Sequence, residues 1–257
     1  MWHHICSNAN VKNEKMRPMN YNELNFDGMT REQELSMSAA FPALMRKVYV
    51  WMTLALVITG VTAYGVATSP GLLTAIATNS ILFWGLIIAE FGLVVAISSA
   101  INRLSLTTAT LLFVLYSVIN GATLSFIFVL YTMSSIASVF FITAGTFAVM
   151  ALIGYTTKTD LSSMGKILFM ALIGLIIATI VNIFLKSSLM ETVVSYIGVL
   201  IFVGLTAYDS QKIKQMLMMA PDAGEAAQKL ALLGALSLYL DFVNLFIYLL
   251  RIFGRRE

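Results

Sequence analysis

Three acidic residues interrupt long apolar stretches of this 257-residue chain: Glu90, Asp209 and Asp241. Asp241 is the clearest of them, because Leu-Tyr-Leu precedes it and Phe-Val follows it. An acid at the centre of a membrane span costs about 2.5–3.5 kcal/mol on insertion scales. Each of the three therefore needs a partner or a use.

Asp241 also belongs to a polar stripe on its own segment. Residues spaced i, i+4, i+7 and i+11 share one face of a helix, and here they are Ser237, Asp241, Asn244 and Tyr248. The other positions of the segment are mostly Leu, Phe and Ile, so we expect the stripe to face the protein interior or a wet cavity. Ser237 and Asn244 join Arg103 and Glu90 as a candidate secondary site.

Asp209 and Asp241 have a defined chemistry if they meet. Two carboxylates in a low-dielectric site cannot both ionise cheaply, so the pair takes up and releases protons as a unit. A shared proton would hold the two helices together, and its loss, or the entry of a cation, would push them apart. Carboxylate oxygens are also the ligands that Ca²⁺ prefers. We therefore interpret Asp209 and Asp241 as a gate that senses pH and contacts metal, with no catalytic residue.

Structural roles are the alternative for each charged residue. Asp209 could be a solvated acid at a helix end beside a basic loop, and Asp241 a neutral acid that bonds a neighbouring helix. Glu90 shows no partner in the sequence. Arg103 could be an anchor that sets orientation, or it could extend toward an acid at the same membrane face.

Seven apolar segments would position these residues. The chain is 59% hydrophobic and 11% charged, with a mean hydropathy of +0.85, whereas soluble domains carry roughly 25% charged residues. Only helices and closed barrels span a membrane, and continuous apolar runs such as residues 172–178 do not alternate as a barrel strand would. The sequence predicts an all-α membrane protein with spans near residues 45–67, 81–101, 106–130, 135–155, 166–185, 192–211 and 228–250.

The expected division of the chain is simple. Residues 1–43 form a polar, disordered cytoplasmic tail without a signal peptide, residues 44–254 a seven-helix membrane domain, and residues 255–257 a short basic end. Lys and Arg gather in alternate loops, which places the N-terminus in the cytoplasm. A full crossing of the last segment puts three arginines outside, against that rule: Arg251, Arg255 and Arg256. A re-entrant last helix is the alternative, and we favour the full crossing.

Composition limits the function. The two histidines, His3 and His4, precede the spans, which excludes membrane serine proteases and the usual zinc, haem and di-iron sites there. A net charge of +3 gives no argument for nucleic acid. An intramembrane aspartyl protease is a weak rival, because Asp241 lacks a preceding Gly-x-Gly. We expect no enzyme and no tightly bound cofactor. A cation/proton exchanger and a non-transporting interaction protein stay open.

Two segments resemble the Bax-inhibitor family. The stretch Ala235-Leu-Ser-Leu-Tyr-Leu-Asp-Phe-Val-Asn-Leu-Phe-Ile-Tyr-Leu-Leu-Arg-Ile-Phe-Gly254 is similar to its C-terminal signature, and Leu205-Thr-Ala-Tyr-Asp-Ser-Gln-Lys-Ile-Lys214 to its sixth-helix motif. Span count and spacing agree from about residue 40 onward. The resemblance implies seven helices with the last one central, wrapped by the other six.

The resemblance also carries functional expectations. It implies a proton-sensitive calcium leak in which Asp209 and Asp241 are the sensor. In the family an arginine and an acid on the second helix can accompany that site, and Arg103 and Glu90 are the nearest candidates. The expected setting is a bacterial cytoplasmic (inner) membrane, with the lipid bilayer, calcium and protons as partners. We expect a monomer, with an oligomer left open.

Overall fold

The computed structural model describes residues 31–220 and 222–255, with side chains from residue 40 onward. Nine helices occupy this part of the chain: α1 (Arg31–Ala67), α2 (Pro70–Thr78), α3 (Ser80–Ala100), α4 (Leu106–Leu124), α5 (Ile127–Leu130), α6 (Met133–Thr156), α7 (Ser162–Leu185), α8 (Ser188–Met218) and α9 (Glu225–Phe253). Among the described residues, seven helical segments are long and apolar enough to cross a membrane, with α4 and α5 counted together. The predicted all-α fold of seven spans is confirmed.

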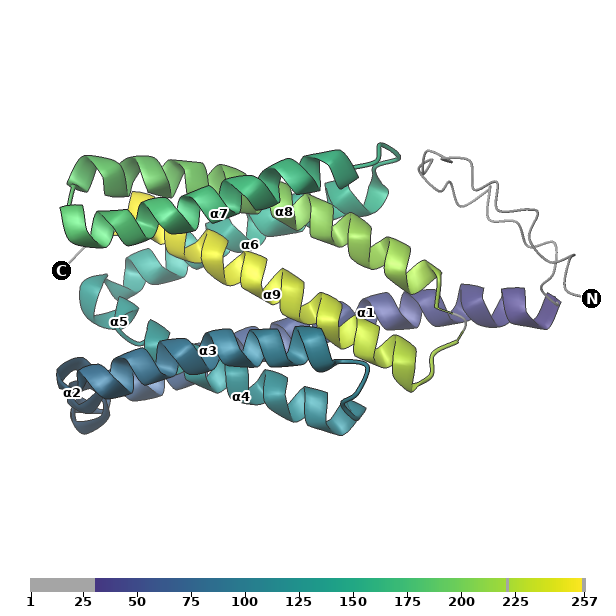
Figure 1. The fold of residues 1–257 in the computed structure, drawn as a ribbon, viewed down its shortest axis with the longest axis horizontal. Coiled ribbons are helices and arrows are strands. Elements are labelled where there is room, and N and C mark those ends of the chain that lie inside the picture. Colours follow the sequence, from purple (N-terminus) through teal and green to yellow (C-terminus); the bar gives the residue numbers. More distant parts are fainter. Residues whose placement is uncertain (1–30, 221, 256–257) are drawn as a thin grey trace, which may run out of the picture.

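Helix α9 is the centre of the bundle. In Figure 1 it runs diagonally between α1, α3 and α4 on one side and α6, α7 and α8 on the other. The most apolar stretch of α9 is 61% buried, against 6% for α3 and for α7. Helices α1, α4, α6 and α8 pack directly on α9, whereas α3 packs on α4 and α7 packs on α8. The central position expected for the last helix is therefore confirmed, with α3 and α7 in the outer positions.

Several helix ends differ from the predicted spans. Helix α1 begins at Arg31, so residues 31–43 of the predicted tail are helical, while residues 1–30 lie outside the described part. Helix α8 continues to Met218 and includes Lys212 and Lys214, which the sequence analysis assigns to a loop. The reason is physical: hydropathy falls where the chain leaves the hydrocarbon, but the helical hydrogen bonds continue into the interface.

The last helix crosses the whole bundle. Arg255 follows its end and is tied to the turn before α6: its N–H donates to Ser135 Oγ at 3.0 Å, and its carbonyl accepts from the Thr132 N–H at 3.1 Å. This turn lies at the opposite end of the bundle from the α6–α7 loop. Helix α9 thus runs the full length of the bundle, as the full crossing predicts.

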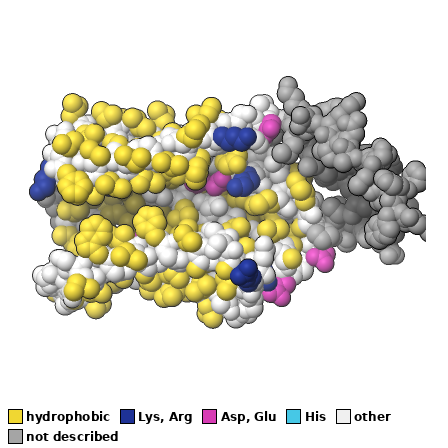
Figure 2. All heavy atoms as spheres, in the orientation of Figure 1, with side chains coloured by type: hydrophobic (Ala, Val, Ile, Leu, Met, Phe, Trp, Pro, Cys, Tyr) yellow, Lys and Arg dark blue, Asp and Glu magenta, His cyan; other side chains and the backbone are white. Residues whose placement is uncertain are grey.

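Charged side chains gather at the two ends of the molecule. Figure 2 shows an apolar middle, with most of the visible Lys, Arg, Asp and Glu near the end where α8 stops and α9 starts. We call this the basic end, defined by Arg46, Lys47, Arg103, Lys158, Lys166, Lys212, Lys214 and Lys229. The opposite, C-terminal end carries Lys186, Arg251 and Arg255.

Helices α6 and α8 approach each other most closely at Gly154. A Cβ at this position would overlap the backbone carbonyl of Ala207. One turn away, Ser210 Oγ donates to the carbonyl of Ala151 at 2.8 Å. Small residues that let helix backbones touch are a common basis of packing in membranes, so Gly154 fixes how α8 lies against α6.

This contact gives a prediction for stability. We expect Gly154→Ala to destabilise the protein by about 1–3 kcal/mol, the usual cost of overpacking a well-packed site. The measurement is the thermal unfolding midpoint of purified protein in detergent. Gly145→Ala is the matched control, because it lies on the same helix and its added methyl would meet nothing within 4 Å. Equal midpoints for the two variants would contradict this account of the α6–α8 contact.

Candidate functional site

Asp209 and Asp241 lie on α8 and α9, which are adjacent and antiparallel. Two glycine contacts set the register of these helices: Gly234 against Ile213, and Gly198 against the ring of Tyr248. In this register Asp241 is level with Thr206, and Asp209 lies about one helical turn nearer the basic end. The structure thus brings the two predicted acids together at one interface. We call them the aspartate pair.

The pair lies in a strongly desolvated place. Asp241 is 5% exposed, and its Oδ2 is buried with no hydrogen-bond donor in the described part of the chain. The carboxylates of Asp209 and Asp241 are near enough to interact electrostatically, and Asp209 also interacts with the charge of Lys212. Buried polar atoms almost always have a partner, so the unpartnered oxygen of Asp241 marks this site.

The residues around Asp209 have structural partners. Gln211 holds the α6–α7 loop, with Nε2 donating to the Thr159 carbonyl at 2.8 Å and Oε1 accepting from the Leu161 N–H at 2.9 Å. Lys214 Nζ donates to the carbonyl of Tyr155 at 2.8 Å. Asp209 itself accepts no hydrogen bond from any described residue. The sixth-helix motif therefore bonds α8 to α6 and to the α6–α7 loop, while its one acid, Asp209, takes part in none of these hydrogen bonds.

The polar stripe on α9 is only partly engaged. The ring of Tyr248 stacks on Phe202 of α8 with centroids 5.8 Å apart. Asn244 Nδ2 donates to the Leu240 carbonyl of its own helix at 2.8 Å, and Ser237 is half-buried. Asp241 and Tyr248 thus face α8, whereas no hydrogen bond among the described residues links Ser237 or Asn244 to the aspartate pair.

The other two candidate residues lie away from the pair. Arg103 is exposed at the basic end after α3, and no ion pair joins it to Asp209 or Asp241 in the described part of the chain. Glu90 of α3 accepts hydrogen bonds from Asn120 Nδ2 at 3.3 Å and from Thr123 Oγ1. The four candidate secondary residues therefore do not form one site with the pair, and Glu90 has partners that its own sequence neighbourhood did not show.

A second polar cluster lies on the other face of α9. Tyr239 Oη donates to Asn120 Oδ1 at 2.8 Å and lies 2.7 Å from Thr59 Oγ1. Thr59 Oγ1 also reaches the Ser117 carbonyl at 3.0 Å. Through Asn120 the chain of hydrogen bonds continues to Glu90, so it joins α1, α3, α4 and α9. Tyr239 precedes Asp241 by two residues, which places the two side chains on opposite faces of the helix.

This cluster was not predicted from the sequence. Its signal was present, because Asn120 is a lone amide inside an apolar span and Tyr239 stands beside Asp241 in the C-terminal signature. No rule based on one segment could join them, since 119 residues separate the two.

As ligands for a metal ion, the aspartate pair supplies two carboxylates. Among the described residues, no three or more His, Cys, Asp or Glu side chains are grouped so that they could hold a metal ion. Ca²⁺ takes six to eight oxygen ligands. A calcium ion at Asp209 and Asp241 would therefore keep part of its water shell.

The family model described as inhibitor of apoptosis-promoting Bax1 matches residues 42–257, which include all of the aspartate pair's surroundings. The chain belongs to the Bax-inhibitor family. Its relatives include the inner membrane protein YbhL of Escherichia coli K12, 50% identical over 220 residues that cover 85% of this chain and 94% of the relative. A protein of Borreliella burgdorferi is 48% identical over 230 residues, covering 89% and 98%. One of Rickettsia prowazekii is 44% identical over 221 residues, covering 83% and 89%.

The resemblance seen in two short segments is thus confirmed over nearly the whole membrane domain. Both the sixth-helix motif and the C-terminal signature lie inside the matched range. In this member of the Bax-inhibitor family most residues of these motifs pack helices, and the two aspartates are acids that accept no hydrogen bond from the described residues.

The cluster around Tyr239 gives a second prediction. We expect Tyr239→Phe to lower the stability of this Bax-inhibitor family member by about 1–2 kcal/mol, because Asn120 and Thr59 each lose a buried partner. The thermal unfolding midpoint in detergent measures it. Tyr116→Phe is the control: its ring lies 5.7 Å from that of Tyr239, but no hydrogen bond to its hydroxyl is present among the described residues. A Tyr239→Phe midpoint no lower than that of the control would refute the role of the cluster.

Proposed function

We propose that this protein is a pH-sensitive calcium leak channel of the bacterial cytoplasmic membrane, gated by Asp209 and Asp241. The observation that supports it best is the buried Oδ2 of Asp241, which lacks a donor and has a second carboxylate nearby. Two negative charges in a low-dielectric site repel each other strongly. The pair must therefore share a proton, accept a cation, or move apart.

Protons and calcium compete for the same oxygens. With one proton on the pair, a neutral acid can face a carboxylate, and α8 and α9 stay together. When that proton leaves, the two charges repel, and either the helices separate or a cation enters between them. Acid should therefore close the path and a higher pH should open it.

The contacts of α8 suggest which part moves. Ser210, Gln211 and Lys214 tie α8 to α6 and to the α6–α7 loop. Helix α9 is held on its other side by Tyr239, through Asn120 and Thr59. Repulsion at the pair would thus displace α8 together with α6 as one body, a common form of switching in packed proteins. The ring contacts of Phe140 and Phe147 of α6 with Phe242 of α9 would have to slide in that motion.

Access would come from the basic end. Asp209 is half-buried and lies nearer that end, whereas Asp241 is buried about one turn deeper. An ion would meet Asp209 first and then Asp241. A site of two carboxylates with part of the water shell retained binds calcium weakly, and weak binding suits passage rather than storage.

Flux measurements test the gate. We expect calcium flux into vesicles that contain the purified protein to rise with pH, by up to about tenfold per pH unit if one proton is titrated. Asp209→Asn and Asp241→Asn should each stay near the low, acid level at every pH, because a neutral amide imitates the protonated acid.

Asp160→Asn is the matched control. Its carboxylate lies in the α6–α7 loop, where the hydrogen bonds from Ser162 hold the pKa of Asp160 below its ordinary value. It therefore stays ionised through the tested range, and its replacement should leave the pH profile unchanged. An unaltered profile in Asp209→Asn or Asp241→Asn would overturn the gate.

The same preparation separates the rival functions. A cation/proton exchanger would move protons against calcium in a fixed ratio. An aspartyl protease would cleave a helical peptide, and both aspartate variants would abolish cleavage without any flux. A protein that only packs or binds partners would show neither activity, and the aspartate variants would change its stability alone.

We further propose that the N-terminus is cytoplasmic, because the basic end carries the N-terminal side of α1 and most of the Lys and Arg. We expect alkaline phosphatase fused after Glu257 to be active in the periplasm and green fluorescent protein at the same position to be dark. A fusion that ends at Lys158 should give the reverse pattern. A fluorescent C-terminal fusion would contradict this orientation.

A further inference from the structure

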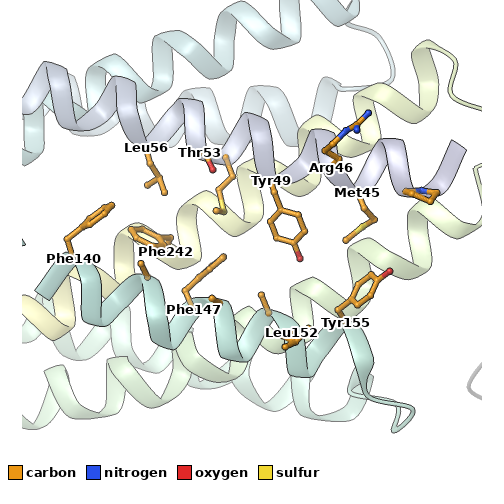
Figure 3. Close-up of a pocket in the computed structure, with 15 residues that line it drawn as sticks. Met45, Arg46, Tyr49, Thr53, Leu56, Phe140, Phe147, Leu152, Tyr155 and Phe242 are labelled. Carbon is orange, nitrogen blue, oxygen red and sulfur yellow. The ribbon is translucent and has the colours of Figure 1, made fainter.

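A long groove opens on the side of the bundle between α1 and α6. Its volume is about 670 Å³. Figure 3 shows Tyr49 and Leu56 of α1 facing Phe147 and Leu152 of α6 across it, with Phe242 of α9 at its inner side. Both walls pack on α9. The groove is separate from the aspartate pair, which lies on the α8 face of α9.

The groove is open toward the bilayer. Leu152 is 62% exposed and Phe140 is 40% exposed, whereas Met45 and Met52 on the inner side are buried. Both walls belong to spans that cross the membrane. An apolar groove at that depth is filled by hydrocarbon, because lipid tails are the surrounding solvent there.

The length of the groove fits one leaflet. On α1 it runs from Pro42 to Leu56, which is about 21 Å at the rise of an α-helix. One leaflet contributes about 15 Å of hydrocarbon, half of a bilayer core of about 30 Å. The groove therefore extends from the headgroup level at the basic end down to about the bilayer midplane.

The outer end of the groove is positively charged. Arg46 lines the groove at the same end as Tyr155, and its exposed side chain directs the guanidinium outward, away from the space between α1 and α6 (Figure 3). A phosphate at the headgroup level would therefore meet Arg46 at the outer edge of the groove. Lys214 Nζ lies 4.9 Å from the centroid of the Tyr155 ring. None of the residues that line the groove is acidic. Guanidinium groups bind phosphate through paired hydrogen bonds, and tyrosines favour the headgroup level.

We propose that this groove binds one acyl chain of an anionic phospholipid, with the lipid phosphate at Arg46. The chain lies along α1 and α6 and packs on Phe242, the residue next to Asp241. A zwitterionic lipid can place its tail in the same groove, but its headgroup gains less from the positive end. This proposal does not rest on the gate proposed above, although a displacement of α6 would also change the width of the groove.

Lipid binding by the full-length protein in detergent tests the proposal. Native mass spectrometry would compare phosphatidylglycerol with phosphatidylcholine of the same chain length. We expect the wild type to retain phosphatidylglycerol about fivefold better, since one basic residue near an anionic headgroup contributes about 1 kcal/mol. Arg46→Gln should remove that preference and keep the weaker binding, and Arg103→Gln, an arginine at the same end but outside the groove, should keep both.

A second variant tests the tail. Ala148→Trp fills the groove and should reduce retention of both lipids, whereas Val149→Trp, an exposed neighbour on the same helix outside the groove, should not. Equal retention of the two lipids by the wild type, or equal loss in Arg46→Gln and Arg103→Gln, would overturn the proposal. So would full retention in Ala148→Trp. The arginine variants decide the question even if Ala148→Trp fails to fold.

Discussion

A polar group inside a bilayer must find its partner within the protein, because no water is there to replace it. Helix α9 meets this requirement on one face and leaves it unmet on the other. Tyr239 is bonded to Asn120 and lies against Thr59, which fixes α9 to α1 and α4. Asp241, on the opposite face, keeps an oxygen without a donor. One side of α9 is thus fixed by hydrogen bonds, and the other side carries a buried carboxylate oxygen without a donor among the described residues.

The positions of the seven spans could be predicted because hydropathy records where the chain lies in hydrocarbon. Hydropathy does not show where a helix ends, because a helix can continue beyond the hydrocarbon. Helix α8 passes Lys212 and Lys214 without a break, since the cations reach the interface while the backbone stays helical. Helices α2 and α5 are too short to give a periodic pattern. The basis for predicting α9 as central was the family resemblance, together with its polar stripe.

The candidate site was partly visible for a related reason. Helical spacing alone places Asp241 and Tyr248 on one face, and the resemblance supplies Asp209 as their neighbour. The partners of Glu90 could not be found in this way, because Asn120 and Thr123 lie on another helix and no local pattern sets the register between two helices. The close contact of Gly154 with Ala207 also depends on the register between two helices, so no local pattern predicts it. Contacts between segments far apart in the sequence became visible only in the structure.

The position of α9 in the chain has a consequence for assembly. Synthesis proceeds from the N-terminus at about 5–20 residues per second, so six spans enter the membrane before their common core exists. Helix α4 can pack on α1 and α3, and α8 on α6 and α7, as two separate halves. Until α9 is inserted, each half exposes to lipid the surface that α9 later covers, and in the first half this surface includes Thr59 and Asn120. The two halves can therefore form one bundle only when α9, the last helix, inserts between them.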